Sequence, residues 1–92
     1  MSVVLVTFGP EEGGLYASAL VPDVIEASGM CTLTATNGSQ ILTAEIQAVA
    51  ATTSMNCGFT HIDAGSGDWT ITMTYESVDS TGTSETEQVG VP

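Results

Sequence analysis

The sequence predicts an all-β domain, an antiparallel β-sandwich of about seven strands. Residues 30–46 and 69–76 alternate apolar and polar side chains, which is the signature of strands with one buried face. The composition favours the same class, because Thr, Val, Ala, Ser and Gly dominate and turn signals recur about every dozen positions. With 92 residues, 42% of them hydrophobic, the chain can build one core, so we expect a single domain over residues 1–92.

The N-terminal part, residues 1–14, is predicted to be an apolar strand followed by a Gly/Pro hinge. The segment from Val3 to Phe8 is apolar on both faces, and Gly9-Pro10-Glu11-Glu12-Gly13-Gly14 has the composition of a linker. Such an apolar strand is unsuited to an exposed sheet edge. It therefore either pairs within its own sandwich or adds to the sheet of another copy. A weaker strand over residues 15–21 follows and ends at Pro22-Asp23.

A β-hairpin is predicted in the middle of the chain. Asn37-Gly38 separates two alternating segments, and this dipeptide favours a two-residue type I′ turn. One face of the hairpin is then apolar and the other mostly threonine. After Ile46, residues 48–53 are either a strand continued after a bulge or a loop. The register that this turn predicts pairs Thr36 with Ser39, Leu33 with Leu42, and Cys31 with Ala44.

The clearest strand covers residues 69–76, WTITMTYE. Its apolar residues share one face with Trp69, so this tryptophan is predicted in the core rather than on the surface as a platform for a sugar. The remaining aromatic residues are too few for an obvious exposed platform. A shorter strand before it, residues 55–59, turns Cys57 and Phe59 to one inward side.

The last strand, residues 83–91, is predicted to be a polar sheet edge. Glu85 and Glu87 lie on one face of it, where their charges deter edge-to-edge pairing with another chain.

The charge balance excludes whole classes of partner and chemistry. The chain has no lysine or arginine and eleven acidic residues, giving a net charge of −11. Nucleic acids and anionic membranes would repel it, so neither is expected as a partner. Phosphate clamps and Schiff-base lysines are excluded as well. Neither a membrane-spanning segment nor an intact secretion signal is expected, since no apolar run is long enough and no basic residue precedes one.

Three segments give the chain a family resemblance, namely Cys31-Thr-Leu-Thr-Ala-Thr, Asn56-Cys57-Gly58 and the stretch from Gly67 to Tyr75. Over about residues 15–92 it resembles bacterial immunoglobulin-like (fibronectin III/invasin-like) β-sandwich domains. The resemblance implies an antiparallel immunoglobulin-like β-sandwich that serves as a spacer, stalk or adhesion module. The chain departs from the antibody pattern because Trp69 follows both cysteines instead of lying between them.

The two cysteines predict one disulfide, Cys31–Cys57, because both lie on inward faces of predicted strands. The bond would close a loop of about 25 residues and contribute about 3 kcal/mol to stability. It would also indicate an oxidising compartment. The alternative is a pair of buried free thiols acting as small hydrophobic residues.

Two polar features of the sequence are candidate sites. Asp63 and Asp68 frame a glycine-rich loop with carboxylate and carbonyl oxygens, the ligands that calcium prefers, although such loops also occur without metal. His61, with Asp63 and one of many serines, formally offers catalytic groups, but no nucleophile elbow is present. A surface histidine and a non-enzymatic protein without a cofactor are therefore expected.

These observations together predict a structural module of an extracellular or cell-surface protein, or of a particle. One alternative is a filament or virion (phage) decoration subunit, located on the virion surface, that assembles with copies of itself through the segment from Val3 to Phe8. Another alternative is a calcium- or carbohydrate-binding module. The expected partners are proteins, which include copies of this chain if it assembles through the segment from Val3 to Phe8.

Overall fold

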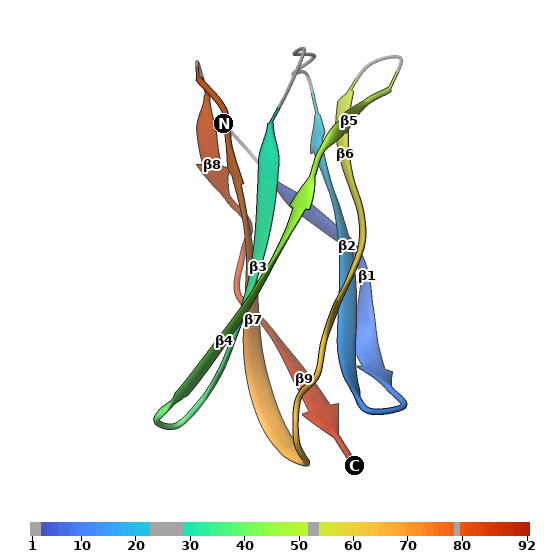
Figure 1. The fold of residues 1–92 in the computed structure, drawn as a ribbon, viewed down its shortest axis with the longest axis vertical. Coiled ribbons are helices and arrows are strands. Elements are labelled where there is room, and N and C mark those ends of the chain that lie inside the picture. Colours follow the sequence, from blue (N-terminus) through green and yellow to red (C-terminus); the bar gives the residue numbers. More distant parts are fainter. Residues whose placement is uncertain (1–2, 23–28, 52–53, 79) are drawn as a thin grey trace.

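The computed structural model describes residues 3–22, 29–51, 54–78 and 80–92, and these ranges fold as two antiparallel sheets packed into a sandwich (Figure 1). The molecule is elongated, with extents of 37, 22 and 17 Å. Among the described residues, no helix is long and apolar enough to span a membrane. Nine strands lie in these ranges: β1 (Val4–Glu11), β2 (Gly14–Pro22), β3 (Met30–Asn37), β4 (Gln40–Gln47), β5 (Val49–Ala50), β6 (Ser54–Ile62), β7 (Gly67–Glu76), β8 (Thr81–Thr83) and β9 (Glu87–Val91).

The predicted antiparallel sandwich is confirmed, with strands in the order β1-β2-β6-β5 in one sheet and β4-β3-β7-β8 in the other, where β9 also pairs with β7. The described part of the chain has nine strands instead of about seven for two reasons. Residues 48–53, which the sequence allows as either a strand or a loop, contain the short strand β5. Thr52 and Thr53 lie outside the described residues. Asp23, at the predicted end of the second strand, lies outside them as well. The predicted C-terminal edge strand is split into β8 and β9.

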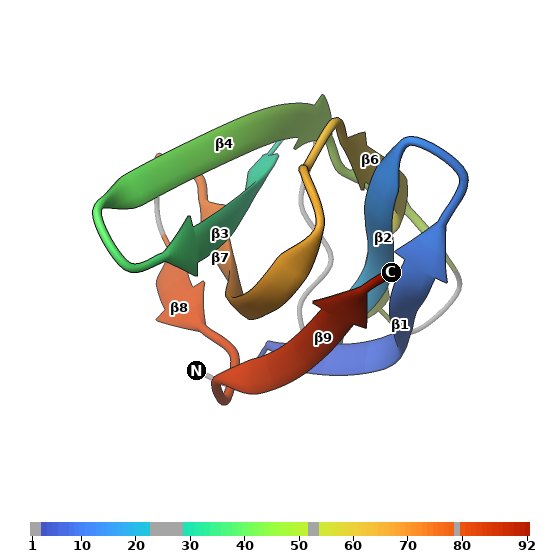
Figure 2. The same ribbon diagram turned by 90° about the horizontal axis from the view of Figure 1, so that it is seen from below.

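Figure 2 shows the two sheets from the end. Buried apolar side chains from both sheets form one hydrophobic core between them. Alternate residues of β3 and β7 point inward from one sheet, and residues of β2 and β6 meet them from the other. Each large apolar side chain buried in this way contributes about 1.5–3 kcal/mol. The largest fully buried apolar side chains include Trp69, Tyr75, Leu15, Leu33, Met55, Ile71, Met73 and Val21.

Trp69 lies in this core, as the alternation predicts. It is 1% exposed, and its indole Nε1 donates a hydrogen bond to the Gly65 carbonyl oxygen at 2.8 Å. The indole N–H therefore has a partner despite its burial, which removes the cost of desolvating it.

The hairpin forms, but its turn lies one residue further along the chain than predicted. Gly38 and Ser39 make the turn, with Gly38 at a φ of 58°, and Asn37 pairs with Gln40. The predicted partners are therefore wrong by two residues, while the predicted faces are right, because only an odd shift exchanges the faces of a strand. The observed register gains one cross-strand pair. It places Leu33 opposite Ala44, Ala35 opposite Leu42 and Cys31 opposite Ile46.

A β-bulge in β6 reverses the predicted side of Phe59. The ladder with β2 skips one residue between Asn56 and Gly58, so Cys57 is the extra residue. Gly58 has a φ of 69°, and its N–H donates to the Asn56 side-chain oxygen at 2.7 Å. Because the bulge shifts the alternation by one, Cys57 remains in the core while Phe59 is 69% exposed. The expectation that both residues face inward is wrong for Phe59.

The N-terminal segment pairs within its own sheet. Strand β1 continues through Gly9 and Pro10 to Glu11 and runs alongside β2, and Glu12-Gly13 makes the turn between them. The segment predicted to be a hinge is thus a hairpin end. Pro10 is accommodated because β1 is an edge strand, where a missing N–H breaks no ladder on its free side.

Candidate functional site

The Cys31–Cys57 disulfide joins the two sheets, which confirms the predicted pairing. Cys31 lies on β3 and Cys57 on β6, their Cα atoms are 5.7 Å apart, and both residues are buried. The bond connects residues 26 positions apart, so in the chain-entropy account it contributes about 3.5 kcal/mol by restricting the unfolded chain. The sheets are therefore held by a covalent cross-link in addition to the core.

A polar cluster around His61 lies on the outer face of the neighbouring strands β1, β2 and β6. His61 stands opposite Tyr16 of β2, and Tyr16 stands opposite Gly9 of β1. Glu11, at the end of β1, reaches His61 Nδ1, while Asp63, just after β6, accepts from Nε2 at 2.7 Å. Glu11 and Asp63 thus hold the imidazole from opposite sides.

The two carboxylates favour the protonated form of His61. A neutral imidazole carries one N–H, so only the imidazolium can donate to both partners at once. The hydrogen bond to Asp63, followed by that to Glu11, raises the pKa of His61 above its ordinary value of 6.5. Because the chain has no lysine or arginine, this ring is its one side chain able to carry a positive charge in the neutral pH range.

The hydrogen bonds of this cluster occupy both ring nitrogens, which a catalytic or metal-binding role of His61 would use. Both ring nitrogens of His61 are occupied by carboxylates, so neither is available to take a proton from a serine. Glu11 and Asp63 lie at opposite edges of the ring and cannot meet His61 around one ion. No group of three or more potential metal ligands occurs within the described residues.

An aromatic pair borders this cluster. The rings of Tyr16 and Phe59 are 6.0 Å apart and inclined by 46°. They line a shallow hollow of about 370 Å³ together with Thr7, Glu11, Thr60 and His61. The pair is not evident from the sequence, because only the bulge at Gly58 turns Phe59 outward.

The two aspartates proposed as calcium ligands have different surroundings. Asp63 is exposed and engaged by His61. Asp68 belongs to β7 opposite Gly90, and its Oδ1 would lie 3.5 Å from a Cβ at that glycine. Calcium binding by this loop stays a prediction.

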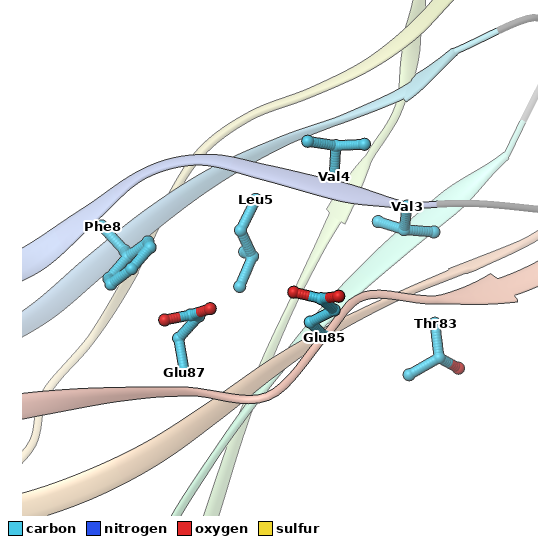
Figure 3. Close-up of a pocket in the computed structure, with 7 residues that line it drawn as sticks. All are labelled: Val3, Val4, Leu5, Phe8, Thr83, Glu85 and Glu87. Carbon is cyan, nitrogen blue, oxygen red and sulfur yellow. The ribbon is translucent and has the colours of Figure 1, made fainter.

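A groove opens between the edges of the two sheets, where β1 faces the end of the chain that carries β8 and β9. Figure 2 shows β9 beside β1, and Figure 3 shows the side chains that line the groove. Its volume is about 400 Å³. One wall is apolar and the other is polar. The lining residues are Val3, Val4, Leu5 and Phe8 on the first wall and Thr83, Glu85 and Glu87 on the second.

The polar wall of the groove results from a break in the sheet edge between β8 and β9. Ser84 takes the place of a regular ladder residue: its N–H donates to the Met73 carbonyl oxygen at 2.8 Å, and its Oγ accepts from the Met73 N–H at 2.9 Å. Glu85 follows outside the ladder, and Glu87 opens β9. Both glutamates point across the groove towards Leu5 and Phe8 (Figure 3). From the sequence, these glutamates are predicted only to protect a sheet edge, and the groove beside them is not evident.

Comparison with protein-family models, curated proteins and solved structures finds no match for this chain. The function of these sites is therefore inferred from their own geometry and chemistry.

Proposed function

We propose that the chain is a non-enzymatic structural module of an extracellular surface protein or particle, acting as a stalk, adhesion or assembly unit. The observation that carries the proposal is the buried Cys31–Cys57 disulfide that ties the two sheets together. Disulfides persist in oxidising compartments and are rare in the cytosol, so the bond hints at an extracellular setting.

The strand order supports an immunoglobulin-like family for this module. The order β1-β2-β6-β5 over β4-β3-β7 corresponds to the A-B-E-D and C′-C-F sheets of that architecture. The disulfide joins β3 to β6, whereas antibody domains join the strands equivalent to β2 and β7. Membership of the bacterial immunoglobulin-like (fibronectin III/invasin-like) group is therefore proposed on topology, and the cross-link is a departure from the antibody pattern.

The surface chemistry also suits exposure outside a cell. Trypsin-like proteases cleave after lysine and arginine, and this chain has neither. A net charge of −11 keeps modules soluble and apart, which is useful where many copies or repeats stand close together.

The test compares oxidised and reduced protein. We expect mass spectrometry of protein made in its native compartment to show the Cys31–Cys57 bond. We also expect reduction to lower the free energy of unfolding, measured in urea, by about 3.5 kcal/mol. Chymotrypsin should digest the reduced form faster than the oxidised form. Free thiols in the native protein, together with no loss of stability on reduction, would contradict the proposal.

An alternative is that the module is a filament or virion subunit that assembles through β1. The free edge of β1 is available for strand addition by a second copy, and Val6, the extra residue of a bulge in β1, is 55% exposed there. Light scattering would detect such assemblies. Val6→Lys should abolish them, since a charge at a sheet edge opposes pairing, whereas Val49→Lys on β5 should not.

A second candidate function is carbohydrate binding by the Tyr16–Phe59 pair. A half-buried Tyr16 ring and an exposed Phe59 ring lie beside a carboxylate and a histidine, a combination that can stack on a sugar ring and hydrogen-bond its hydroxyls. Titration with cellohexaose and chitohexaose, followed by NMR, tests this idea. Shifts at Tyr16 and His61, which line the same hollow, that disappear in Phe59→Ala would support it. Calcium binding is tested separately, by comparing the thermal midpoint of the protein with added calcium and with a chelator.

A further inference from the structure

We propose that the groove between β1 and β8–β9 binds an extended peptide segment of a partner protein, in which lysine or arginine alternates with aliphatic residues. The inference goes beyond the structural role proposed above and does not depend on it.

The two walls of the groove offer different chemistry to one occupant. Val3, Leu5 and Phe8 point into the groove from the β1 side, and Glu85 and Glu87 point towards them from the other side (Figure 3). Leu5 and Phe8 are half-buried and pack against the core, so this packing holds the apolar wall in place. A ligand that fills this space must therefore be apolar on one side and polar on the other.

The charges on the polar wall favour a positively charged partner from outside the chain. Glu85 and Glu87 make no side-chain hydrogen bond or ion pair with the described residues. The protein has no lysine or arginine to neutralise them, and its single histidine is already held by Glu11 and Asp63. Next to an apolar wall the local dielectric is low, which strengthens the attraction of a cation to these carboxylates.

A second copy of this chain is a poor occupant. It would bring a net charge of −11 against another −11, and it has no lysine or arginine to place beside the glutamates. The complementary occupant is a basic segment of another protein.

The spacing of the glutamates specifies the pattern of that segment. Glu85 precedes β9 and Glu87 opens it, and both point into the groove (Figure 3). Two positions of an extended peptide span about 7 Å, which sets the scale for a ligand that meets both. In an extended peptide, residues two apart point to the same side and the residue between them points to the other. Basic residues at i and i+2 would therefore meet the glutamates, while the residue between them would face the β1 wall.

The experiment uses the whole oxidised chain and two labelled heptapeptides in fluorescence anisotropy. One peptide alternates Lys and Val, and the other has the same composition as a block of lysines followed by a block of valines. We expect the alternating peptide to bind at least about tenfold more tightly and to weaken as salt is raised. NMR shifts should be confined to the two walls, residues 3–8 and 83–87.

Matched variants distinguish binding in the groove from attraction of the peptide to the net negative charge of the protein. The double variant E85Q/E87Q should weaken binding of the alternating peptide about tenfold or more. The double variant E12Q/E45Q removes the same charge elsewhere and should change binding less than about twofold. On the apolar wall, Leu5→Ala should weaken binding, whereas Leu42→Ala should not. Leu42 is also half-buried against the core, on β4.

Three results would overturn the inference. The first is equal affinity for the alternating and block peptides. The second is an equal loss in E85Q/E87Q and E12Q/E45Q, which would mean that the peptides respond to net charge alone. The third is self-association of the chain, detected by light scattering, that E85Q/E87Q strengthens and that the alternating peptide does not displace. In that case a second copy occupies the groove.

Discussion

At the scale of single residues, His61 is notable because it is the one side chain that can offset the negative charge of this protein near neutral pH. Its hydrogen bonds connect the end of β1, at Glu11, to the segment after β6, at Asp63. These residues are 50 and 2 positions away from His61 in the sequence, so the cluster exists only when the sheet is formed.

The cluster predicts a pH dependence of stability. The pKa of His61 is higher in the folded protein than its ordinary value of 6.5. Its contribution to stability is therefore fully present below pH 6.5 and is lost as the pH rises through the folded-state pKa. His61→Gln should accordingly lower the urea midpoint at about pH 5.5 and have little effect at about pH 9.

An NMR titration checks the cause directly. Asp63→Asn should lower the pKa of His61, since the hydrogen bond to Asp63 is the largest contribution to its rise. Asp68→Asn is the control, because it removes the same charge from a residue that does not contact His61. A His61 pKa at or below 6.5 in the unmodified protein would contradict the assignment.

Gly58 controls which side of the sheet Phe59 occupies, and its substitution has a predictable cost. Its φ of 69° lies in the left-handed region, while an added Cβ would make only an ordinary contact of 3.8 Å with the Ile46 side chain. Gly58→Ala should therefore destabilise the protein by about 1–2 kcal/mol through backbone strain alone. The measurement is urea unfolding of both proteins.

Gly65→Ala is the matched control for that prediction. No atom lies within 4 Å of a Cβ built at Gly65, and its φ is not in the left-handed region. This substitution should change stability by less than about 0.5 kcal/mol. Equal effects at the two glycines would show that the bulge does not depend on the conformation of Gly58.

At the scale of strands, the interruption of the sheet edge between β8 and β9 opens the groove. The Ser84 hydroxyl accepts the N–H of Met73, a fully buried residue, and donates to the Glu85 carbonyl oxygen at 2.9 Å. One side chain thus supplies a hydrogen-bond partner to the backbone where the ladder is interrupted. The chain can therefore leave the sheet without leaving a buried N–H group that has no acceptor.

Ser84→Ala should consequently cost about 1–3 kcal/mol, because the Met73 N–H would lose its acceptor inside the protein. Hydrogen exchange should show faster exchange of the Met73 amide in the variant. Ser39→Ala, in the exposed hairpin turn, is the comparison and should be nearly neutral. An unchanged exchange rate at Met73 would mean that the hydroxyl is not its acceptor in solution.

At the scale of the whole molecule, a net charge of −11 on 92 residues means that the folded state repels itself. Salt screens this repulsion, so sodium chloride should raise the thermal midpoint at neutral pH. The effect should shrink near pH 4.1, where the net charge approaches zero, and solubility should fall there. A midpoint that is insensitive to salt at neutral pH would contradict this account.

The sequence by itself determined the all-β sandwich, the inward faces of the main strands and the Cys31–Cys57 pairing. The faces follow from local alternation, because a period of two assigns them without knowledge of the partner strand. The pairing follows because the chain has two cysteines and alternation turns both inward. The exclusion of nucleic-acid and anionic-membrane partners needs only the absence of basic residues, and it remains a prediction.

The tertiary structure alone decided the register of the hairpin, the side of Phe59, the partners of His61 and the existence of the groove. A shift of two residues preserves every face, so alternation cannot select the register. The bulge at Gly58, where φ is positive, changes which side chains of β6 face the core, and the composition of the strand gives no sign of this change. The His61 cluster and the groove join residues distant in sequence, so their geometry depends on how the strands pair and how the two sheets pack.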